Sequence, residues 1–118
     1  MGERLRSYRA AVERGSPLRD AGSSVFDRFS ELYHLAYEEG ALSTKTLELV
    51  ALAISVVRDC EDCITYHMIR LHELEASREE IFQLFALTLV VGGSTVIPTL
   101  RKSASFLDEL DEGRTGGT

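Results

Sequence analysis

The sequence has no hydrophobic run as long as a membrane-spanning helix requires. Such a helix needs about 20 consecutive apolar residues, whereas Glu48 interrupts the apolar stretch 47–57 and Gln83 interrupts the stretch 81–91. The first residues, MGERLRSYRAAVERGS, are charged and contain no apolar segment of the kind found in secretory signals. We therefore expect a cytoplasmic protein that does not enter a membrane.

An excess of positive charge is also missing. The chain contains 13 Lys and Arg residues against 19 Asp and Glu residues, which gives a formal net charge of −6. Proteins that bind nucleic acids or anionic lipid surfaces generally carry a basic patch that attracts the polyanion. The charge balance therefore argues against nucleic acid and membranes as partners.

Proline and cysteine are scarce, with two residues of each. Few prolines, together with 44% hydrophobic and 27% charged residues, are typical of a globular chain and exclude a disordered or collagen-like one. Two cysteines in a chain without an export signal indicate redox chemistry or metal binding rather than a disulfide framework. A length of 118 residues predicts one domain over 1–118, with its core at about 23–110 and a disordered tail at 111–118.

No stretch of useful length alternates between apolar and polar residues, so no β-strand is predicted. Apolar residues recur instead at helical spacing, and the sequence predicts an all-α fold of about five to six helices. The predicted helices cover residues 3–14, about 25–37, 44–57, about 60–74, 78–91 and 94–110. Ser43 and Asp59 are the expected N-caps, residues 77–80 form a capping box, and Gly92-Gly93 ends the helix that follows.

One predicted helix is apolar on almost every face. Its body, IFQLFALTLVV at residues 81–91, has nine apolar residues in eleven. A helix of this kind is fully buried, and one chain of this size can hardly cover all of it. We therefore predict a homo-oligomer, and we expect the 44–57 helix to be largely buried as well. The aromatic face of the 25–37 helix is interpreted as core or subunit interface, with the wall of a substrate pocket as the alternative. This face contains Phe26, Phe29, Tyr33 and Tyr37.

The two cysteines are followed by a histidine at helical spacing. In a helix, Cys60, Cys63 and His67 lie on one face, because intervals of three and four residues return to the same side. The first turn of a helix favours an anion, which lowers the pKa of a thiol placed there. His67 lies one turn beyond Cys63, as a base lies beside a nucleophile. Cys60 lies one turn before it and can condense with an oxidised Cys63 to form a disulfide.

Other interpretations of this cluster are open. The two cysteines can be small buried hydrophobic residues, since free cysteine is often buried. A structural zinc ion can bind Cys60, Cys63 and His67, with His72 or Glu48 as a fourth ligand. Thioredoxin-like chemistry is disfavoured, because no strand precedes the motif. From its spacing alone, Glu48 is interpreted as a solvated acid near the start of its helix.

Glu48, eleven residues, and then C-x-x-C-x-x-x-H match a known pattern in residue type and spacing. With this motif, the later SREEI segment and an apolar helix that ends in Gly-Gly, the chain resembles the alkylhydroperoxidase D-like (AhpD-like) group of the carboxymuconolactone decarboxylase family. The resemblance covers about residues 43–110. It implies a compact all-α AhpD-like fold, homo-oligomers of three or six subunits, and an antioxidant peroxidase activity.

The resemblance also implies roles for the matched residues. Cys63 would be the thiol that attacks the peroxide, and Cys60 the partner that closes the disulfide. Glu48 and His67 would form a proton relay through a water molecule. The implied partners are a hydroperoxide substrate and a dithiol reductant such as a lipoylated adaptor protein, and no bound organic cofactor is implied.

The function predicted from the sequence is the reduction of hydroperoxides through a Cys60/Cys63 dithiol–disulfide cycle. The alternative from another class is a non-catalytic assembly or metal-binding protein with zinc at Cys60, Cys63 and His67. A lactone decarboxylase is less favoured, because members of the family with that activity generally lack the cysteine pair.

Overall fold

The computed structural model describes residues 2–22 and 24–116 of the chain. Within these residues every regular element is a helix and none is a strand, which confirms the predicted all-α fold. The elements are α1 (Glu3–Arg14), α2 (Ser16–Asp20), α3 (Ser24–Leu35), α4 (Thr44–Val57), α5 (Glu61–Glu73), α6 (Arg78–Gly92), the 3₁₀ turn η1 (Ser94–Val96) and α7 (Ile97–Gly116). None of the helices in this part of the chain is both long and apolar enough to cross a membrane.

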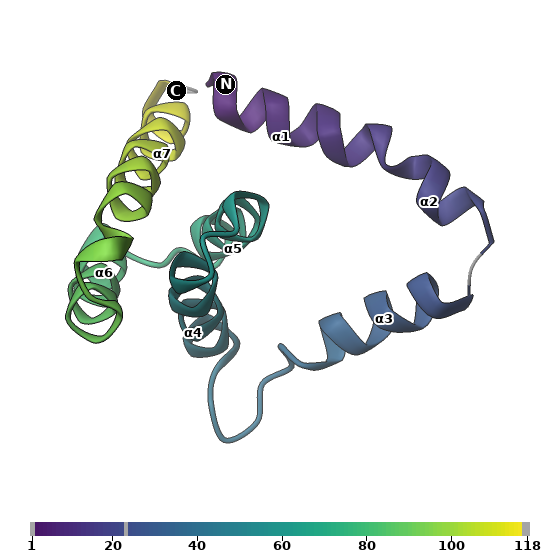
Figure 1. The fold of residues 1–118 in the computed structure, drawn as a ribbon, viewed down its shortest axis with the longest axis horizontal. Coiled ribbons are helices and arrows are strands. Elements are labelled where there is room, and N and C mark those ends of the chain that lie inside the picture. Colours follow the sequence, from purple (N-terminus) through teal and green to yellow (C-terminus); the bar gives the residue numbers. More distant parts are fainter. Residues whose placement is uncertain (1, 23, 117–118) are drawn as a thin grey trace.

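Helices α4 to α7 pack together around the hydrophobic core, whereas α1, α2 and α3 form an arm beside them (Figure 1). The arm starts where α1 lies beside the end of α7, runs away from the core through α2, and returns with α3 toward α4 and α5. The Leu5 amide donates to Glu109 Oε1 at 3.1 Å, which joins the first helix to the last. The fully or almost fully buried core residues are Leu52, Val56, Ile64, Met68, Leu71, Ile81, Phe85, Phe106 and Leu107.

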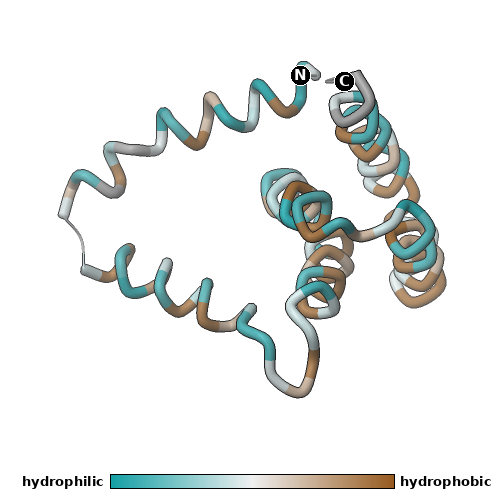
Figure 2. Tube along the Cα trace, turned by 180° about the vertical axis from the view of Figure 1, so that it is seen from behind, coloured by the Kyte–Doolittle hydropathy of each residue, from teal (hydrophilic) through white to brown (hydrophobic). Residues whose placement is uncertain are grey.

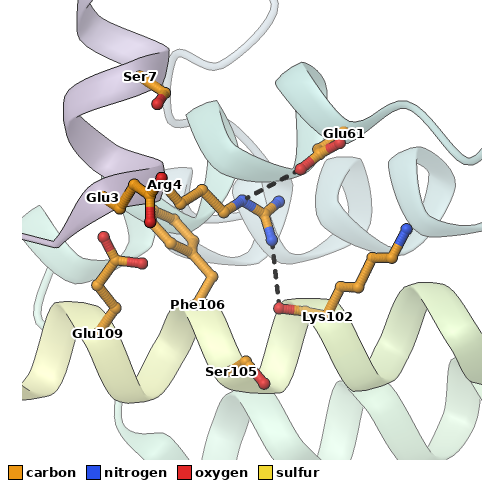
Figure 3. Close-up of a pocket in the computed structure, with 8 residues that line it drawn as sticks. All are labelled: Glu3, Arg4, Ser7, Glu61, Lys102, Ser105, Phe106 and Glu109. Atoms are coloured by element: carbon orange, nitrogen blue, oxygen red, sulfur yellow. Dashed lines mark hydrogen bonds and ion pairs between the residues drawn. The ribbon is translucent and has the colours of Figure 1, made fainter.

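Arg4 fixes α1 against α5 and α7 (Figure 3). Its Nε and Nη2 atoms donate to Thr65 Oγ1 at 3.1 and 2.9 Å, and Nη1 donates to the Lys102 carbonyl at 3.2 Å. The guanidinium also lies over the Phe106 ring, 4.7 Å from its centroid. These contacts border a cavity of about 520 Å³ between the three helices. They hold the start of the arm next to α5, the helix that carries the cysteines.

Three predicted helix ends are confirmed. Ser43 Oγ accepts a hydrogen bond from an amide in the first turn of α4 at 3.1 Å. At the start of α6, the Glu80 amide donates to Ser77 Oγ and the Ser77 amide donates to Glu80 Oε1, at 3.1 and 2.8 Å, which is a complete capping box. The helix is followed by Gly93 at a φ of 83°, a left-handed conformation that glycine adopts without strain.

The prediction that Asp59 caps the cysteine-containing helix is wrong. Asp59 has a φ of 54°, in the left-handed region, whereas an N-cap residue is extended. Cys60 is the N-cap instead: its Sγ accepts a hydrogen bond from the Cys63 amide at 3.3 Å, and α5 begins at Glu61. The Asp59 carboxylate accepts a hydrogen bond from Thr99 Oγ1 at 2.8 Å and so ties the turn between α4 and α5 to α7.

The single chain does not cover all of α6, which agrees with the prediction that one chain of this size can hardly do so. Only Ile81, Phe85 and Thr88 are buried on this helix, whereas Val90 and Val91 are 81% and 76% exposed. One side of α6 packs against α4 and α7, and among the described residues no other helix covers the opposite side. Figure 2 shows that α6 is apolar along most of its length, so its apolar surface extends beyond the part that the core uses.

Helices α4 and α3 also leave apolar side chains open. On α4, Val50, Ile54 and Val57 are each about half exposed, so this helix is less buried than predicted. Helix α3 has no buried residue at all among those described. Its aromatic face is therefore not part of the core of this chain.

Three segments differ from the predicted ranges. Helix α3 ends at Leu35, before Tyr37, and the short helix α2, with Pro17 in its first turn, was not predicted. Helix α7 continues to Gly116, through residues 111–116 that were predicted to be disordered. Residues 117 and 118 lie outside the described residues, and the division into one domain with its core at 23–110 stays a prediction.

Candidate active site

The two cysteines lie at the start of α5. Cys60 and Cys63 form a disulfide, and their Cα atoms are 5.3 Å apart. The Cys60 amide donates to the Ser55 carbonyl at 3.1 Å, which holds this turn against the end of α4. Cys63 lies in the first turn of α5 and is exposed, whereas Cys60 is half-buried. The disulfide therefore lies at the positive end of the helix dipole, where solvent can reach Cys63.

One turn further along α5, His67 pairs with Glu48 of α4. His67 Nδ1 lies 2.7 Å from Glu48 Oε2, and the two side chains are only 3% and 1% exposed. Arg70 Nε lies 3.7 Å from the other oxygen of Glu48. The guanidinium places a positive charge beside this buried carboxylate. Glu48 is thus a buried partner of His67 and not the solvated acid that its position in the sequence indicated.

The contact with Glu48 fixes which His67 nitrogen is free for chemistry. An ionised carboxylate only accepts hydrogen bonds, so Nδ1 of His67 carries the proton and donates it to Glu48. In a neutral imidazole the other nitrogen, Nε2, is then an acceptor. Any proton that His67 takes up must bind at Nε2.

Three tyrosines surround the His67 ring. The ring centroids of Tyr33, Tyr37 and Tyr66 lie 6.1, 5.6 and 5.1 Å from the imidazole centroid. The hydroxyl of Tyr33 lies 2.8 Å from Nε2, and that of Tyr37 lies 3.5 Å from the same atom. Burial, the hydrogen bond with Tyr37 and the charge of Glu48 all raise the pKa of Tyr33 above its ordinary value. Tyr33 therefore keeps its proton at neutral pH and donates it to Nε2.

Two surface cavities open at Cys63. The larger, of about 360 Å³, is lined by Phe29, Ser30, Tyr33, His34, Asp62, Cys63 and Tyr66. The smaller, of about 250 Å³, is lined by Tyr33, Tyr37, Ala51, Ile54, Ser55, Arg58, Cys60, Cys63 and His67. Aromatic rings dominate the first cavity, whereas the second brings both sulfur-bearing side chains and the imidazole together. Cys63 and Tyr33 line both cavities.

A third cavity borders the site on the Glu48 side. It has a volume of about 350 Å³, and Glu48, Arg70, Tyr37 and Tyr66 are among its lining residues. Arg70 Nη1 also donates to Glu73 at 3.0 Å, so its guanidinium links the buried carboxylate to an exposed one. The Glu48–His67 pair thus separates a polar cavity from the cavity that contains the cysteines.

The structure brings all four predicted site residues together. Cys60, Cys63 and His67 line one cavity, and Glu48 binds the far nitrogen of His67. Arg70 was not predicted as a site residue, although its position three residues after His67 places it on the same face of α5. Tyr33 was predicted to lie in the core or a subunit interface, with the wall of a substrate pocket as the less favoured alternative.

The geometry gives no support to a zinc site. Across residues 2–22 and 24–116, no three His, Cys, Asp or Glu side chains are grouped so that they could hold a metal ion. The two sulfurs are bonded to each other, and both nitrogens of His67 are engaged by Glu48 and Tyr33.

Comparison with known proteins establishes the family. Residues 24–105, well over half of the chain, match the model of the Carboxymuconolactone decarboxylase family. The chain belongs to this family. The chain is 26% identical over 94 residues to an uncharacterised protein of Cupriavidus necator, and the match covers 80% of this chain and 83% of that protein. It is 29% identical over 91 residues to uncharacterised protein 4 in the cox locus of Paracoccus denitrificans, covering 77% and 82% of the two chains.

Solved structures of carboxymuconolactone decarboxylase family proteins share the fold. One from Thermotoga maritima, described as a candidate for the antioxidative response, matches with a TM-score of 0.76 and 45% identity, over 80% of this chain and 97% of that chain. One from Legionella pneumophila matches with a TM-score of 0.85 and 25% identity, over 92% and 98% of the chains. These matches confirm two predictions: the chain is an AhpD-like member of the family, and its fold is all-α.

Proposed function

We propose that this carboxymuconolactone decarboxylase family member is a thiol-dependent peroxidase, which reduces hydroperoxides through a Cys60/Cys63 dithiol–disulfide cycle. The observation that carries the proposal is the disulfide-forming pair at the N-terminus of α5, which shares a cavity with the buried His67–Glu48 pair. The description of the Thermotoga maritima relative as a candidate for the antioxidative response agrees with it. Lactone decarboxylation requires no dithiol, so the pair favours redox chemistry.

Cys63 is the attacking thiol in this proposal. It is more exposed than Cys60, it lies in the first turn of α5, and it lines both cavities at the site. The unpaired amides of that turn stabilise a thiolate. The Cys63 thiolate attacks the terminal oxygen of ROOH, the O–O bond breaks, Cys63 becomes a sulfenic acid, and RO⁻ takes up a proton to leave as ROH.

Cys60 completes the cycle. Its thiol attacks the Cys63 sulfenic acid, the S–O bond breaks as the disulfide forms, and the hydroxyl group leaves as water with the Cys60 proton. A dithiol of an external reductant then returns the pair to two thiols by exchange: it supplies both electrons and both protons and becomes a disulfide. A lipoylated adaptor protein, as the family resemblance implies, has the required chemistry.

His67 and Glu48 supply the proton chemistry. His67 takes the proton from the Cys63 thiol and returns it to the departing alkoxide, as a general base and then a general acid. The Glu48 carboxylate, 2.7 Å from Nδ1, stabilises the imidazolium that exists between the two transfers. The burial of Glu48 and the guanidinium of Arg70 beside it support this role.

The larger cavity favours organic hydroperoxides with an apolar group. Phe29, Tyr33 and Tyr66 provide ring surface next to Cys63. An apolar group that buries 40 Å² of its surface there gains about 1 kcal/mol, which hydrogen peroxide cannot gain.

The functional form in this proposal is a homo-oligomer, with three or six subunits as in the family that the chain resembles. The open sides of α4 and α6 meet at a shallow apolar cavity of about 310 Å³, and Ile54, Val57, Leu87 and Val91 are among its lining residues. Leu87 and Val91 are 61% and 76% exposed. A second copy of the chain is the partner that buries this surface.

A thiol count with peptide mapping tests the proposed function. The protein is reduced, and its zinc content is measured. It is then treated with one equivalent of cumene hydroperoxide, and free thiols are counted over time. We expect the rapid loss of two thiols and the recovery of a Cys60–Cys63 linked peptide. Two thiols that stay unreactive would refute the proposal.

The two serine variants test the assignment of roles. Cys63→Ser should abolish peroxide consumption. Cys60→Ser should consume about one equivalent and stop at a sulfenic acid that dimedone traps. Equal consumption by the two variants would contradict the assignment.

A further inference from the structure

The arm contributes a side chain, Tyr33, that contacts His67 and lines the cavities at Cys63. Because Nδ1 of His67 is bound to Glu48, only Nε2 can exchange a proton with a thiol. Nε2 is already bound to the Tyr33 hydroxyl at 2.8 Å. A proton that moves between His67 and a cysteine must therefore pass through this hydroxyl or displace it.

Tyr33 also has access to the attacking sulfur. It lines the aromatic cavity and the smaller cavity, and Cys63 lines both as well. Tyr37, whose hydroxyl lies at 3.5 Å from Nε2, lines only the second of these cavities. A hydroxyl group donates one hydrogen bond and accepts others, so it can receive a proton on one side while it releases its own on the other.

We propose that the Tyr33 hydroxyl carries the proton between Cys63 and His67, in the place that a water molecule would take in such a relay. The proposal rests on the peroxidase function above. In the first step, the thiol proton of Cys63 moves to Tyr33 Oη while the Tyr33 proton moves to Nε2. The products are a Cys63 thiolate and an imidazolium that the Glu48 carboxylate stabilises.

The second step reverses this transfer. After the thiolate has broken the O–O bond, RO⁻ takes the proton from Tyr33 Oη, and Nε2 returns its proton to the same oxygen. Tyr33 and His67 end in their starting states, and the thiol proton has moved to the alcohol. The raised pKa of Tyr33 agrees with a group that is protonated at the beginning and at the end.

The position of Tyr33 explains why the C-x-x-C-x-x-x-H motif does not contain it. Tyr33 lies on α3, 34 residues before His67, and reaches the site because the arm returns to α5 (Figure 1). The motif on α4 and α5 supplies the sulfurs, the base and the acid, and the arm supplies the group that connects them.

The test compares Tyr33→Phe with Tyr8→Phe. Both variants lose one tyrosine hydroxyl, but Tyr8 lies on α1 and lines neither cavity at Cys63. The first readout is the rate of cumene hydroperoxide reduction between pH 5 and pH 9. General acid–base groups contribute roughly 10²–10⁴-fold to rates. We therefore expect Tyr33→Phe to be at least about tenfold slower at pH 7 and to regain part of this loss at high pH, where the thiol ionises without the relay.

A second readout does not depend on peroxidase activity. It is the pH dependence of Cys63 alkylation by iodoacetamide in the reduced Cys60→Ser background. We expect Tyr33→Phe to move the alkylation profile to higher pH, and Tyr8→Phe to leave it in place. Circular dichroism verifies that each variant is folded.

The outcomes separate the two proposals. If the wild type reduces the peroxide and Tyr33→Phe equals Tyr8→Phe in both readouts, the role of Tyr33 is refuted and the peroxidase function stands. If the wild type fails to reduce the peroxide but Tyr33→Phe still shifts the alkylation profile, the peroxidase function is refuted and the coupling of Tyr33 to the thiol stands.

Discussion

The buried Glu48–His67 pair leads to a prediction of defined size. Replacing Glu48 with Gln keeps the shape of the side chain and an oxygen that can accept the Nδ1 hydrogen bond, but it removes the negative charge. Hydrogen bonds to a charged group contribute about 1.5–3 kcal/mol, and neutral ones about 0.5–1.5 kcal/mol. The imidazolium that forms when His67 takes the thiol proton therefore loses about 1–1.5 kcal/mol of stabilisation, and a loss of 1.36 kcal/mol corresponds to a factor of ten.

The surroundings of Glu48 reinforce this loss. The pair is almost completely buried, so water cannot replace the missing charge. Arg70 stays 3.7 Å from the altered group and then repels the imidazolium without an opposing charge. We therefore expect Glu48→Gln to lower the rates of Cys63 alkylation and of peroxide reduction at pH 7 by about tenfold or more.

Glu73→Gln is the matched control. Glu73 bonds to the same Arg70 at 3.0 Å, but it is exposed and does not contact His67. The two variants remove the same charge from the neighbourhood of one guanidinium, and only Glu48→Gln removes it from the imidazole. The assay is stopped-flow alkylation and peroxide reduction with both variants. Equal rates in the two variants would refute the argument that the Glu48 carboxylate stabilises the imidazolium.

Three further predictions concern the surface, the cap and the cavity. Val90→Glu, at an 81% exposed position of α6, should dissociate the proposed oligomer, as measured by sedimentation velocity. Arg101→Glu, on the exposed side of α7, should leave it intact. A wild type that sediments as a monomer would contradict the proposed assembly. The Lys45 ammonium and the Ser77 amide lower the pKa of Glu80 below its ordinary value of 4.5. Glu80→Gln should therefore reduce the free energy of unfolding above pH 4.5. The difference from the wild type should vanish as the pH falls through the lowered pKa. Urea titrations at several pH values measure this difference, and a pH-independent difference would contradict it. Phe29→Ser should raise the KM for cumene hydroperoxide and leave the KM for hydrogen peroxide unchanged. Equal changes in the two KM values would exclude the aromatic cavity as the binding site.

Local signals in the sequence predicted the helix ends well. Ser43 and the Ser77–Glu80 capping box act over one helical turn, so the residues that determine the structure are neighbours in the chain. Asp59 was the exception, because the N-cap depends on the backbone conformation that the turn adopts. The turn places Asp59 in the left-handed region and leaves the cap to a cysteine sulfur.

The arrangement of the site was predictable only in part. Helical spacing placed Cys60, Cys63 and His67 on one face, but the role of Glu48 came from a resemblance to a family. The contact of Tyr33 with His67 joins residues 34 positions apart, and no periodic pattern encodes such a contact. For α6, the apolar sequence predicted that one chain could not cover the whole helix, but not which side would stay exposed. An apolar face in the sequence indicates that something covers it, without indicating whether the same chain does so.

The sulfur of Cys60 makes two interactions with Cys63. It forms the disulfide, and it accepts the hydrogen bond of the Cys63 amide that caps the start of α5. In the oxidised protein this acceptor is a neutral, bonded sulfur. After reduction the same atom belongs to a thiol, which can also donate a hydrogen bond and is no longer held beside Cys63 by the S–S bond. The amide proton of Cys63 therefore reports the oxidation state of the pair directly. Its NMR resonance is an internal redox indicator that requires no label on the sulfur, no added reductant partner and no substrate.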